Sequence, residues 1–322
     1  MRLVRQLLTF CAVIGTMAAA TPLLAADAPN AAPAMTGSAK DLVLRGDAKC
    51  TRCHDEADSP ELLAIATTRH GVKGDPRTPS CTSCHGESEQ HQGYKGSGKP
   101  PKPDRTFGKN TANSAQERSR ACLTCHEGEK RTYWEGSQHP NNDVACSSCH
   151  TIHGQNDKVR NKKTQTEVCF TCHKTERAEG RRISTHPIEV GKVVCSDCHN
   201  THGSAGPKLL KKNTVIETCF TCHAEKRGPF LFEHRPMTES CVNCHSPHGS
   251  NISPLLRTRP PFLCQECHDG THASGSTAGR NAAGNQAGFV GNPSANVVGS
   301  ACLNCHRQIH GSNSPAGGYF QR

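Results

Sequence analysis

Twenty of the 21 cysteines in this 322-residue chain occur in pairs with two residues between them, and a histidine directly follows each pair. In such a C-x-x-C-H motif the two thiols can bond to the vinyl groups of one porphyrin, and the histidine can coordinate its iron. The paired cysteines are Cys50 and Cys53, Cys81 and Cys84, Cys122 and Cys125, Cys146 and Cys149, Cys169 and Cys172, Cys195 and Cys198, Cys219 and Cys222, Cys241 and Cys244, Cys264 and Cys267, and Cys302 and Cys305. The pattern predicts ten covalently bound c-type haems (haem c), one on each motif. We name each motif by its first cysteine.

Two other chemistries use paired cysteines. Five zinc sites with four cysteines each would also consume all twenty thiols, but they would leave the ten adjacent histidines without a role. A disulfide framework would likewise predict no histidine after each pair. Haem attachment explains both residue types, so we favour it.

The chain holds twice as many histidines as motifs. Ten of the 20 histidines close the motifs and are the predicted proximal iron ligands: His54, His85, His126, His150, His173, His199, His223, His245, His268 and His306. The remaining ten alternate with the motifs along the chain: His70, His91, His139, His153, His186, His202, His234, His248, His272 and His310. This alternation predicts that they are distal axial ligands, so that two imidazoles would bind every iron.

The histidine after the second motif of each pair of motifs cannot bind that motif's own iron. His150 and His153 are three residues apart, which allows a separation of at most ~10–11 Å. Imidazoles on opposite faces of one iron need Cα atoms about 12 Å apart. If each such histidine binds the first haem of its own pair, every haem receives one distal ligand. This scheme predicts that His153 binds the Cys122 haem and that His139 binds the Cys146 haem. A forward scheme would instead place His153 on the iron of His173.

The motifs are grouped into repeated units of two. Three stretches are close copies: ACLTCH…HPNNDVACSSCHTIHG, VCFTCH…HPIEVGKVVCSDCHNTHG and TCFTCH…HRPMTESCVNCHSPHG. A looser copy stands before them and another after them. The predicted decahaem domain, 46–322, therefore comprises five dihaem repeats at about 48–120, 121–167, 168–217, 218–262 and 263–322.

The rest of the chain is too polar to form an ordinary core. Only 34% of the residues are hydrophobic and 4% aromatic, so the haems must supply most of the apolar interior. We predict a multihaem cytochrome c fold with a core of ten stacked haems.

The first residues resemble an export signal. Arg2 and Arg5 precede an apolar run that ends near Ala25 and Ala26, which predicts a signal peptide at 1–26, followed by a flexible N-terminus at 27–45. The formal charge of +10 falls to +8 without the two arginines, and ten ferric haems with their propionates would bring it to about −2. The basic residues thus mainly offset propionates, and we expect no nucleic-acid partner.

Ten haems with two imidazoles each predict an electron-transfer protein with low reduction potentials. A multihaem reductase acting on nitrite or hydroxylamine is the competing hypothesis, but catalysis at iron needs an open axial position, and no motif lacks a distal histidine. We therefore predict an electron carrier with no catalytic residue. Trp134 and Tyr133 are expected to pack near a haem, 94–110 to form a solvated basic loop, and 274–300 to form an irregular linker.

The mature chain resembles the MtrA/DmsE family of decahaem cytochromes. The resemblance rests on the export signal, the ten motifs with their dihaem spacing, and the ending CLNCHRQIHGSNSPAGGYFQR, which places His310 in the expected position. It implies an elongated, mostly irregular chain with short α-helices and little or no β-sheet. It further implies a periplasmic protein inserted through the outer membrane inside a porin-like β-barrel partner. It also implies exchange of electrons with periplasmic or inner-membrane quinol-linked cytochromes and with an outer-surface multihaem cytochrome or a mineral. A free periplasmic shuttle remains the alternative to such a conduit.

Overall fold

A computed structural model describes residues 47–72, 74–108, 110–268, 302–315 and 317–320. The predicted signal peptide, the flexible N-terminus, the 274–300 linker and His272 lie outside the described residues.

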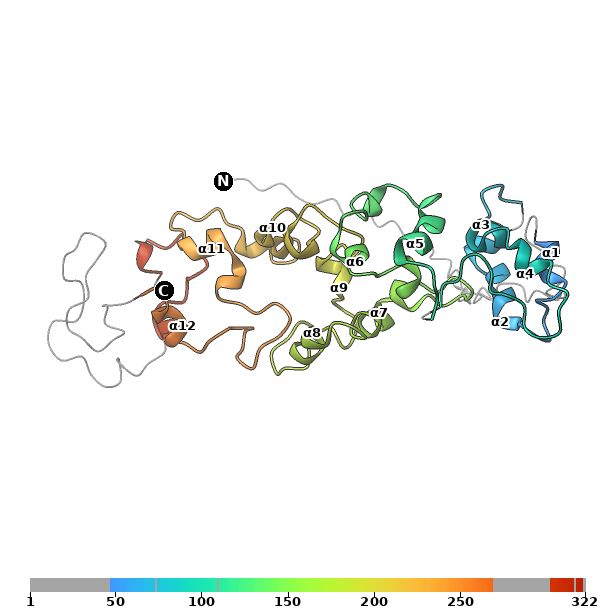
Figure 1. Ribbon diagram of the computed structural model, residues 1–322. Helices are drawn as coiled ribbons and strands as arrows, with labels where there is room; N and C mark the ends of the chain where they lie inside the picture. Colours follow the sequence, from blue (N-terminus) through green and yellow to red (C-terminus); the bar gives the residue numbers. More distant parts are fainter. Residues whose placement is uncertain (1–46, 73, 109, 269–301, 316, 321–322) are drawn as a thin grey trace, which may run out of the picture. The chain divides into compact units, whose positions relative to one another are not determined.

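The described chain consists of short helices joined by irregular segments, as predicted (Figure 1). The α-helices are α1 (Ala48–Thr51), α2 (Pro60–Leu63), α3 (Cys81–His85), α4 (Glu89–Gln92), α5 (Ala115–Leu123), α6 (Gln138–Asn141), α7 (Lys162–Cys169), α8 (Lys174–Glu179), α9 (Cys195–Cys198), α10 (Val215–Phe220), α11 (Arg235–Glu239) and α12 (Phe262–Gln265). The 3₁₀ turns are η2 (Ala64–Thr67), η3 (Arg69–Gly71), η4 (Glu129–Arg131), η5 (Cys146–Ser148), η6 (Lys158–Arg160), η7 (Pro207–Leu209), η8 (Ala224–Lys226), η9 (Cys241–Asn243), η11 (Cys302–Asn304) and η12 (Gly317–Tyr319). Within these residues β-structure is limited to isolated bridges.

The three helices that lead into the first motifs of the close repeats begin at side-chain caps. Ser114 accepts a hydrogen bond from the backbone N–H of Glu117 at the start of α5. Asn161 caps α7 and Thr214 caps α10 in the same manner. These caps satisfy N–H groups that the first helical turn leaves free, so each helix delivers its cysteines from a defined starting point.

Inside each close repeat, the helix of the first motif packs against the turn of the second. Helix α5 contacts η5, α7 contacts α9, and α10 contacts η9. Side chains reinforce this packing, because the backbone N–H of Cys146 donates to Ser119 Oγ over 3.4 Å and that of Ser196 to Gln165 Oε1 over 3.0 Å.

Successive repeats are joined by contacts between the middle of one repeat and the end of the next. We call these contacts joints; they bring together 62–70 with 151–153, 130–139 with 200–203, 184–186 with 247–250, and 231–234 with 310–313. The backbone bridges between Ser184 and Ser250 and between Phe232 and Ser312 belong to the last two. The joints matter because each one holds predicted distal histidines from two different repeats.

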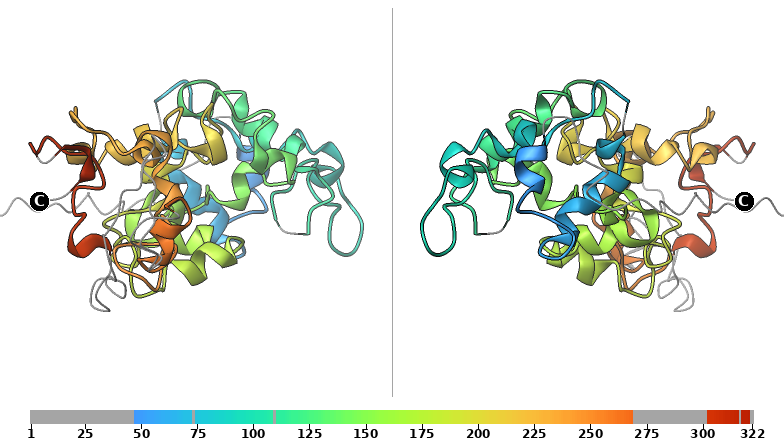
Figure 2. Two further views of the ribbon diagram at one scale, coloured as in Figure 1. Left: turned by 90° about the vertical axis from the view of Figure 1, so that its left-hand side faces the viewer. Right: turned by 90° about the vertical axis from the view of Figure 1, so that its right-hand side faces the viewer.

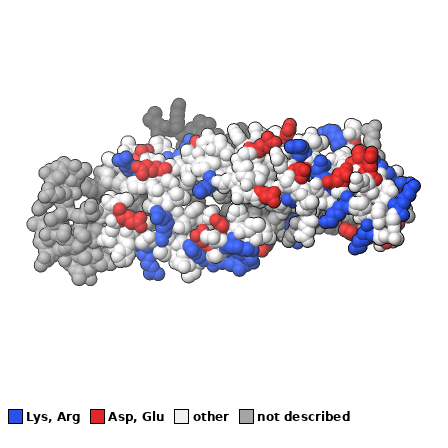
Figure 3. All heavy atoms as spheres, viewed as in Figure 1, with Lys and Arg blue, Asp and Glu red and all other residues white. Residues whose placement is uncertain are grey.

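Protein atoms alone bury few apolar side chains. In the described residues the buried hydrophobic positions are Ala115, Trp134, Ala145, Phe170, Val194 and Leu256. So small a set agrees with a fold that depends on another apolar component. Acidic and basic residues are interspersed over the face in Figure 3, and Figure 2 shows the same chain from its two ends.

Candidate haem-binding sites

Each described motif forms one tight turn. The backbone N–H of the motif's histidine donates to the carbonyl of its first cysteine, for example from His54 to Cys50 over 3.1 Å and from His126 to Cys122 over 2.9 Å. Such a turn brings two thiols and one imidazole to the same region, which is the donor set that c-type haem requires.

The predicted proximal and distal histidines face one another in pairs. Nine pairs of rings have centroids 5.9 to 6.4 Å apart. They are His54 with His91, His126 with His70, His85 with His153, His173 with His139, His150 with His202, His223 with His186, His199 with His248, His268 with His234, and His245 with His310. The tenth proximal histidine, His306, is described, whereas His272 is not.

The spacing of these rings fits an iron held between two imidazoles. Metal–nitrogen bonds of about 2 Å on opposite faces of one ion place the ring centres about 6 Å apart. Direct stacking of two rings without an ion would bring them closer. The described residues also contain no cluster of three or more cysteine, histidine or carboxylate side chains suited to a metal ion. The donor set therefore fits haem iron with two axial histidines better than a cysteine-rich zinc site.

The pairing differs from the predicted scheme within each repeat. His153 faces His85 rather than His126, and it does not face His173 as in the forward scheme. His139 faces His173 rather than His150. The predicted pairing within one repeat occurs only between His54 and His91 among the described pairs. The distance argument against His153 as a partner of His150 holds, because His150 faces His202.

The observed rule is an exchange of histidines at each joint. At the joint of 130–139 with 200–203, His139 comes from the second repeat and faces His173 of the third. His202 comes from the third repeat and faces His150 of the second. The other joints repeat this reciprocal exchange. The predicted scheme paired histidines only within one repeat, and its alternative moved His153 forward, so neither contained a reciprocal exchange between neighbouring repeats.

Hydrogen bonds orient the imidazoles. At the joints, His139 Nδ1 lies 2.9 Å from the carbonyl oxygen of Thr201, and His186 Nδ1 lies 2.9 Å from that of Pro247. With the other ring nitrogen on iron, Nδ1 carries the proton and donates it. Thr201 directly precedes His202, and Pro247 directly precedes His248. Each of these hydrogen bonds therefore links the two distal histidines that meet at one joint.

Burial favours the neutral form of several of the paired imidazoles. Desolvation, with a further contribution from the nearby His150, lowers the pKa of His202 to about 4. Desolvation also lowers the pKa of His85 and of His199. Neutral imidazole is the form that binds metal, so these rings are available as ligands at neutral pH.

Cysteines of each motif lie next to cysteines of the motif that follows it in the sequence. Within repeats the first cysteines lie close enough to interact, as Cys122 does with Cys146 and Cys169 with Cys195. Between repeats the second cysteines interact: Cys84 with Cys125, Cys149 with Cys172, Cys198 with Cys222, and Cys244 with Cys267. The attachment points therefore alternate in a continuous series.

Glycine is required after one of the exchanged histidines. Gly203 has φ +106°, and a Cβ there would overlap the carbonyl group of Tyr133 in the facing segment. We expect Gly203→Ala to destabilise this joint by about 1–3 kcal/mol. A fraction of the iron at the Cys146 motif should then bind carbon monoxide, which can be followed by optical titration. Gly154→Ala is the matched control, because its Cβ would meet only the Thr151 side chain at 3.7 Å; equal behaviour of the two variants would contradict this account.

Other predicted features take more specific roles. Trp134 is buried and lies 6.2 Å from the His202 ring, whereas Tyr133 is 55% exposed.

The 94–110 segment is not merely a solvated loop, because two of its backbone carbonyls contact histidine rings. His91 Nδ1 lies 2.6 Å from the carbonyl oxygen of Pro101, and His85 Nδ1 lies 2.9 Å from that of Arg105. No sequence pattern indicates these contacts, because backbone carbonyls make them.

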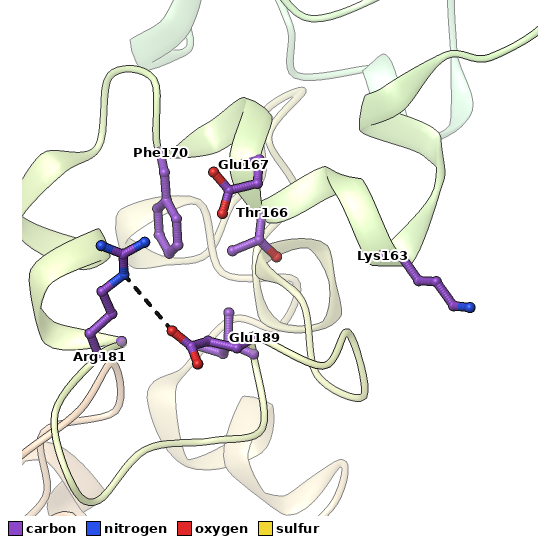
Figure 4. Close-up of a pocket in the computed structure, with 8 residues that line it drawn as sticks. Lys163, Thr166, Glu167, Phe170, Arg181 and Glu189 are labelled. Atoms are coloured by element: carbon purple, nitrogen blue, oxygen red, sulfur yellow. Dashed lines mark ion pairs between the residues drawn. The ribbon is translucent and has the colours of Figure 1, made fainter.

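One surface depression lies between α7 and 180–189 (Figure 4). Arg181 and Glu189 form an ion pair of 3.8 Å across it, beside Phe170. Cysteine and histidine are absent from its lining, so we assign it no part in haem binding. Among the described helices, none has the length and hydropathy to cross a membrane.

Comparison with known proteins agrees with this geometry. A doubled CXXCH motif model matches residues 186–228 and 234–273, and a model of cytochrome c-type protein NrfB-like sequences matches 81–163. The chain is 40% identical to multiheme cytochrome MtrA of Shewanella baltica (strain OS185) over 284 residues, covering 86% of this chain and 82% of that protein. It is 29% identical to cytochrome c-type protein NrfB of Escherichia coli O6:H1 over 41% of this chain and 67% of that protein. The corresponding values for NrfB of Haemophilus influenzae are 28%, 38% and 63%.

The paired motifs and the facing imidazoles thus define a multihaem c-type cytochrome with covalently bound haem, whose activity is electron transfer. At 40% identity over most of both chains, it belongs to the MtrA family of multihaem cytochromes.

Proposed function

We propose that the chain binds ten haems, each held by two histidines, and conducts electrons along them in the order of the motifs. The observation that carries this proposal is the set of nine facing histidine pairs, whose separations suit an iron between each pair. The continuous series of neighbouring cysteines supports conduction, because each thioether would lie beside the next porphyrin. The tenth iron, on His306, would take His272, the histidine that no other pair uses.

The protein is proposed to act as an electron carrier and not as an enzyme. Two axial histidines leave no coordination position for a substrate. A reductase of the nitrite or hydroxylamine type would need at least one open iron, and the described pairs provide none for the nine motifs they include.

We place this electron conduit in the outer membrane, with the chain exported by residues 1–26 and enclosed in a β-barrel partner. The support is membership of the MtrA family together with the polar composition, because a polar haem protein cannot meet lipid directly and only a closed barrel could insulate it. Periplasmic or inner-membrane quinol-linked cytochromes would face one end, and an outer-surface cytochrome or a mineral the other. Electron flow in either direction, for metal reduction or ferrous-iron oxidation, suits such a conduit.

A free periplasmic shuttle is the second candidate, favoured by the NrfB-like match over 81–163. Affinity purification of the tagged chain from detergent-solubilised outer membranes distinguishes the two. A conduit should retain a stoichiometric barrel protein and fractionate with the outer membrane. A chain recovered wholly in the soluble periplasmic fraction, without a barrel, would favour the shuttle.

Haem stoichiometry provides the direct test of cofactor content. The intact mass of the matured holoprotein should exceed that of the mature polypeptide by ten haems, and pyridine haemochrome analysis should give the same ratio. The reduced native protein should bind no carbon monoxide, since every iron is six-coordinate. A haem-free, zinc-loaded product from a host that matures c-type cytochromes would refute the assignment.

A further inference from the structure

One proximal histidine differs from its counterparts in the group that accepts a hydrogen bond from its Nδ1 atom. The second motifs of the first four repeats end in His85, His150, His199 and His245. Three of these place Nδ1 2.9 Å from a backbone carbonyl, of Arg105, Lys208 and Pro254. His150 instead places Nδ1 2.7 Å from Oδ2 of Asp157.

The Asp157 carboxylate replaces two carbonyl groups of the equivalent turns. After the Cys195 motif, His199 contacts the Lys208 carbonyl, and the N–H of Asn200 donates to the Leu209 carbonyl over 2.7 Å. The turn after the Cys241 motif repeats both bonds. After the Cys146 motif, one carboxylate takes both bonds: Oδ2 accepts from His150 and Oδ1 from the N–H of Thr151 over 3.3 Å. The carboxylate is therefore fixed on the imidazole by two contacts.

The setting makes this contact strong. The side chains of His150 and Asp157 are 28% and 16% exposed, so water screens their interaction only partly. Hydrogen bonds to an ionised acceptor are shorter and roughly twice as strong as neutral ones. Three other carboxylates lie farther from ligand histidines: Glu179 at 3.5 Å from His248, which faces His199 of the Cys195 motif, Glu176 at 3.7 Å from His173, and Glu225 at 3.7 Å from His223. All three pairs are more exposed than His150 and Asp157.

We propose that Asp157 lowers the reduction potential of the Cys146 haem below the potentials of the Cys81, Cys195 and Cys241 haems. This rests on the proposed attachment of haem to that motif. A carboxylate that accepts the Nδ1 proton makes the imidazole a more basic ligand, and its negative charge stabilises ferric iron over ferrous iron. The one-electron reduction of this iron is therefore disfavoured, and the fourth haem forms a low point in potential along the conduit.

Cations on the opposite face act in the other direction but more weakly. Lys130 and Arg131 lie near enough to His202 to lower its pKa. The Arg131 side chain is committed to the carbonyl of His126 over 2.7 Å, and Lys130 is exposed. Neither cation is hydrogen-bonded to the imidazole, whereas Asp157 is, so we expect the carboxylate to dominate.

The test is a spectroelectrochemical titration of the full-length holoprotein and of Asp157→Asn. The amide keeps the size and an acceptor oxygen but removes the charge. One haem's share of the absorbance change should move from the low-potential end of the titration to higher potential, while all irons stay low-spin. Asp157→Glu should recover part of the original profile, and Glu176→Gln should shift the titration much less than Asp157→Asn, because Glu176 is farther from its histidine and more exposed.

A second pair of variants locates the effect. In a chain whose Cys146 and Cys149 are both replaced by alanine, the fourth haem cannot attach, so adding Asp157→Asn should change nothing. A shift that persists in this background would overturn the proposal, as would an unchanged titration of Asp157→Asn in the otherwise native chain. Both readouts concern potentials of the isolated protein, so they are independent of whether it crosses a membrane in a barrel.

Discussion

Replacing His153 with alanine should open the iron of the Cys81 haem and leave the Cys122 haem six-coordinate. The His153 ring lies 6.1 Å from the His85 ring, and no other described imidazole faces His85 at that spacing. One iron should therefore become high-spin and the reduced protein should bind one equivalent of carbon monoxide. Electron paramagnetic resonance and optical titration measure the two quantities.

Removing candidate haems identifies the opened site. In a background that lacks Cys81 and Cys84, His153→Ala should give no additional carbon monoxide binding. In a background that lacks Cys122 and Cys125, the binding should persist. The reverse result would restore the pairing of His153 with His126 and contradict the exchange at the joints. His139→Ala is the companion variant and should open the Cys169 haem, because His139 faces His173.

Removing the haem of one central motif should interrupt conduction. With Cys146 and Cys149 replaced by alanine, the haems of the Cys122 and Cys169 motifs would no longer be linked by an intermediate one. Electron tunnelling falls exponentially with distance, so end-to-end transfer should slow by orders of magnitude. The measurement is the rate at which external dithionite reduces a dye enclosed in liposomes that contain the chain and its co-purified barrel partner.

Two controls separate a broken conduit from a collapsed protein. The nine remaining haems should keep their low-spin spectra, and replacing the exposed Lys102, which contacts only the carbonyl of Asn110 among its described hydrogen bonds, should leave the rate unchanged. Transfer at the native rate without the Cys146 haem would mean that the haems do not act in series.

The predictions that rest on neighbouring residues needed no tertiary structure. The two cysteines and the proximal histidine of a motif lie within five consecutive residues, so one turn of backbone brings them together wherever the motif occurs. The low hydrophobic content likewise predicted that the protein atoms would not form an ordinary apolar core, and few apolar side chains are buried in the described residues. The alternation of motifs with spare histidines also predicted one distal histidine for each motif, and the described residues contain nine facing pairs.

Only the tertiary structure decided which histidines face one another. Twenty chemically identical imidazoles with permissive spacings allow many pairings of equal count. The choice depends on joints such as that of 184–186 with 247–250, where Thr185 Oγ1 donates to the carbonyl of His248 over 3.3 Å and His186 contacts that of Pro247. The acceptors of the ring nitrogens follow from the same folding: a carboxylate reaches His150 while a carbonyl reaches His199. Because these contacts join residues from seven to more than sixty positions apart, their identity comes from how the loops pack and not from any local pattern.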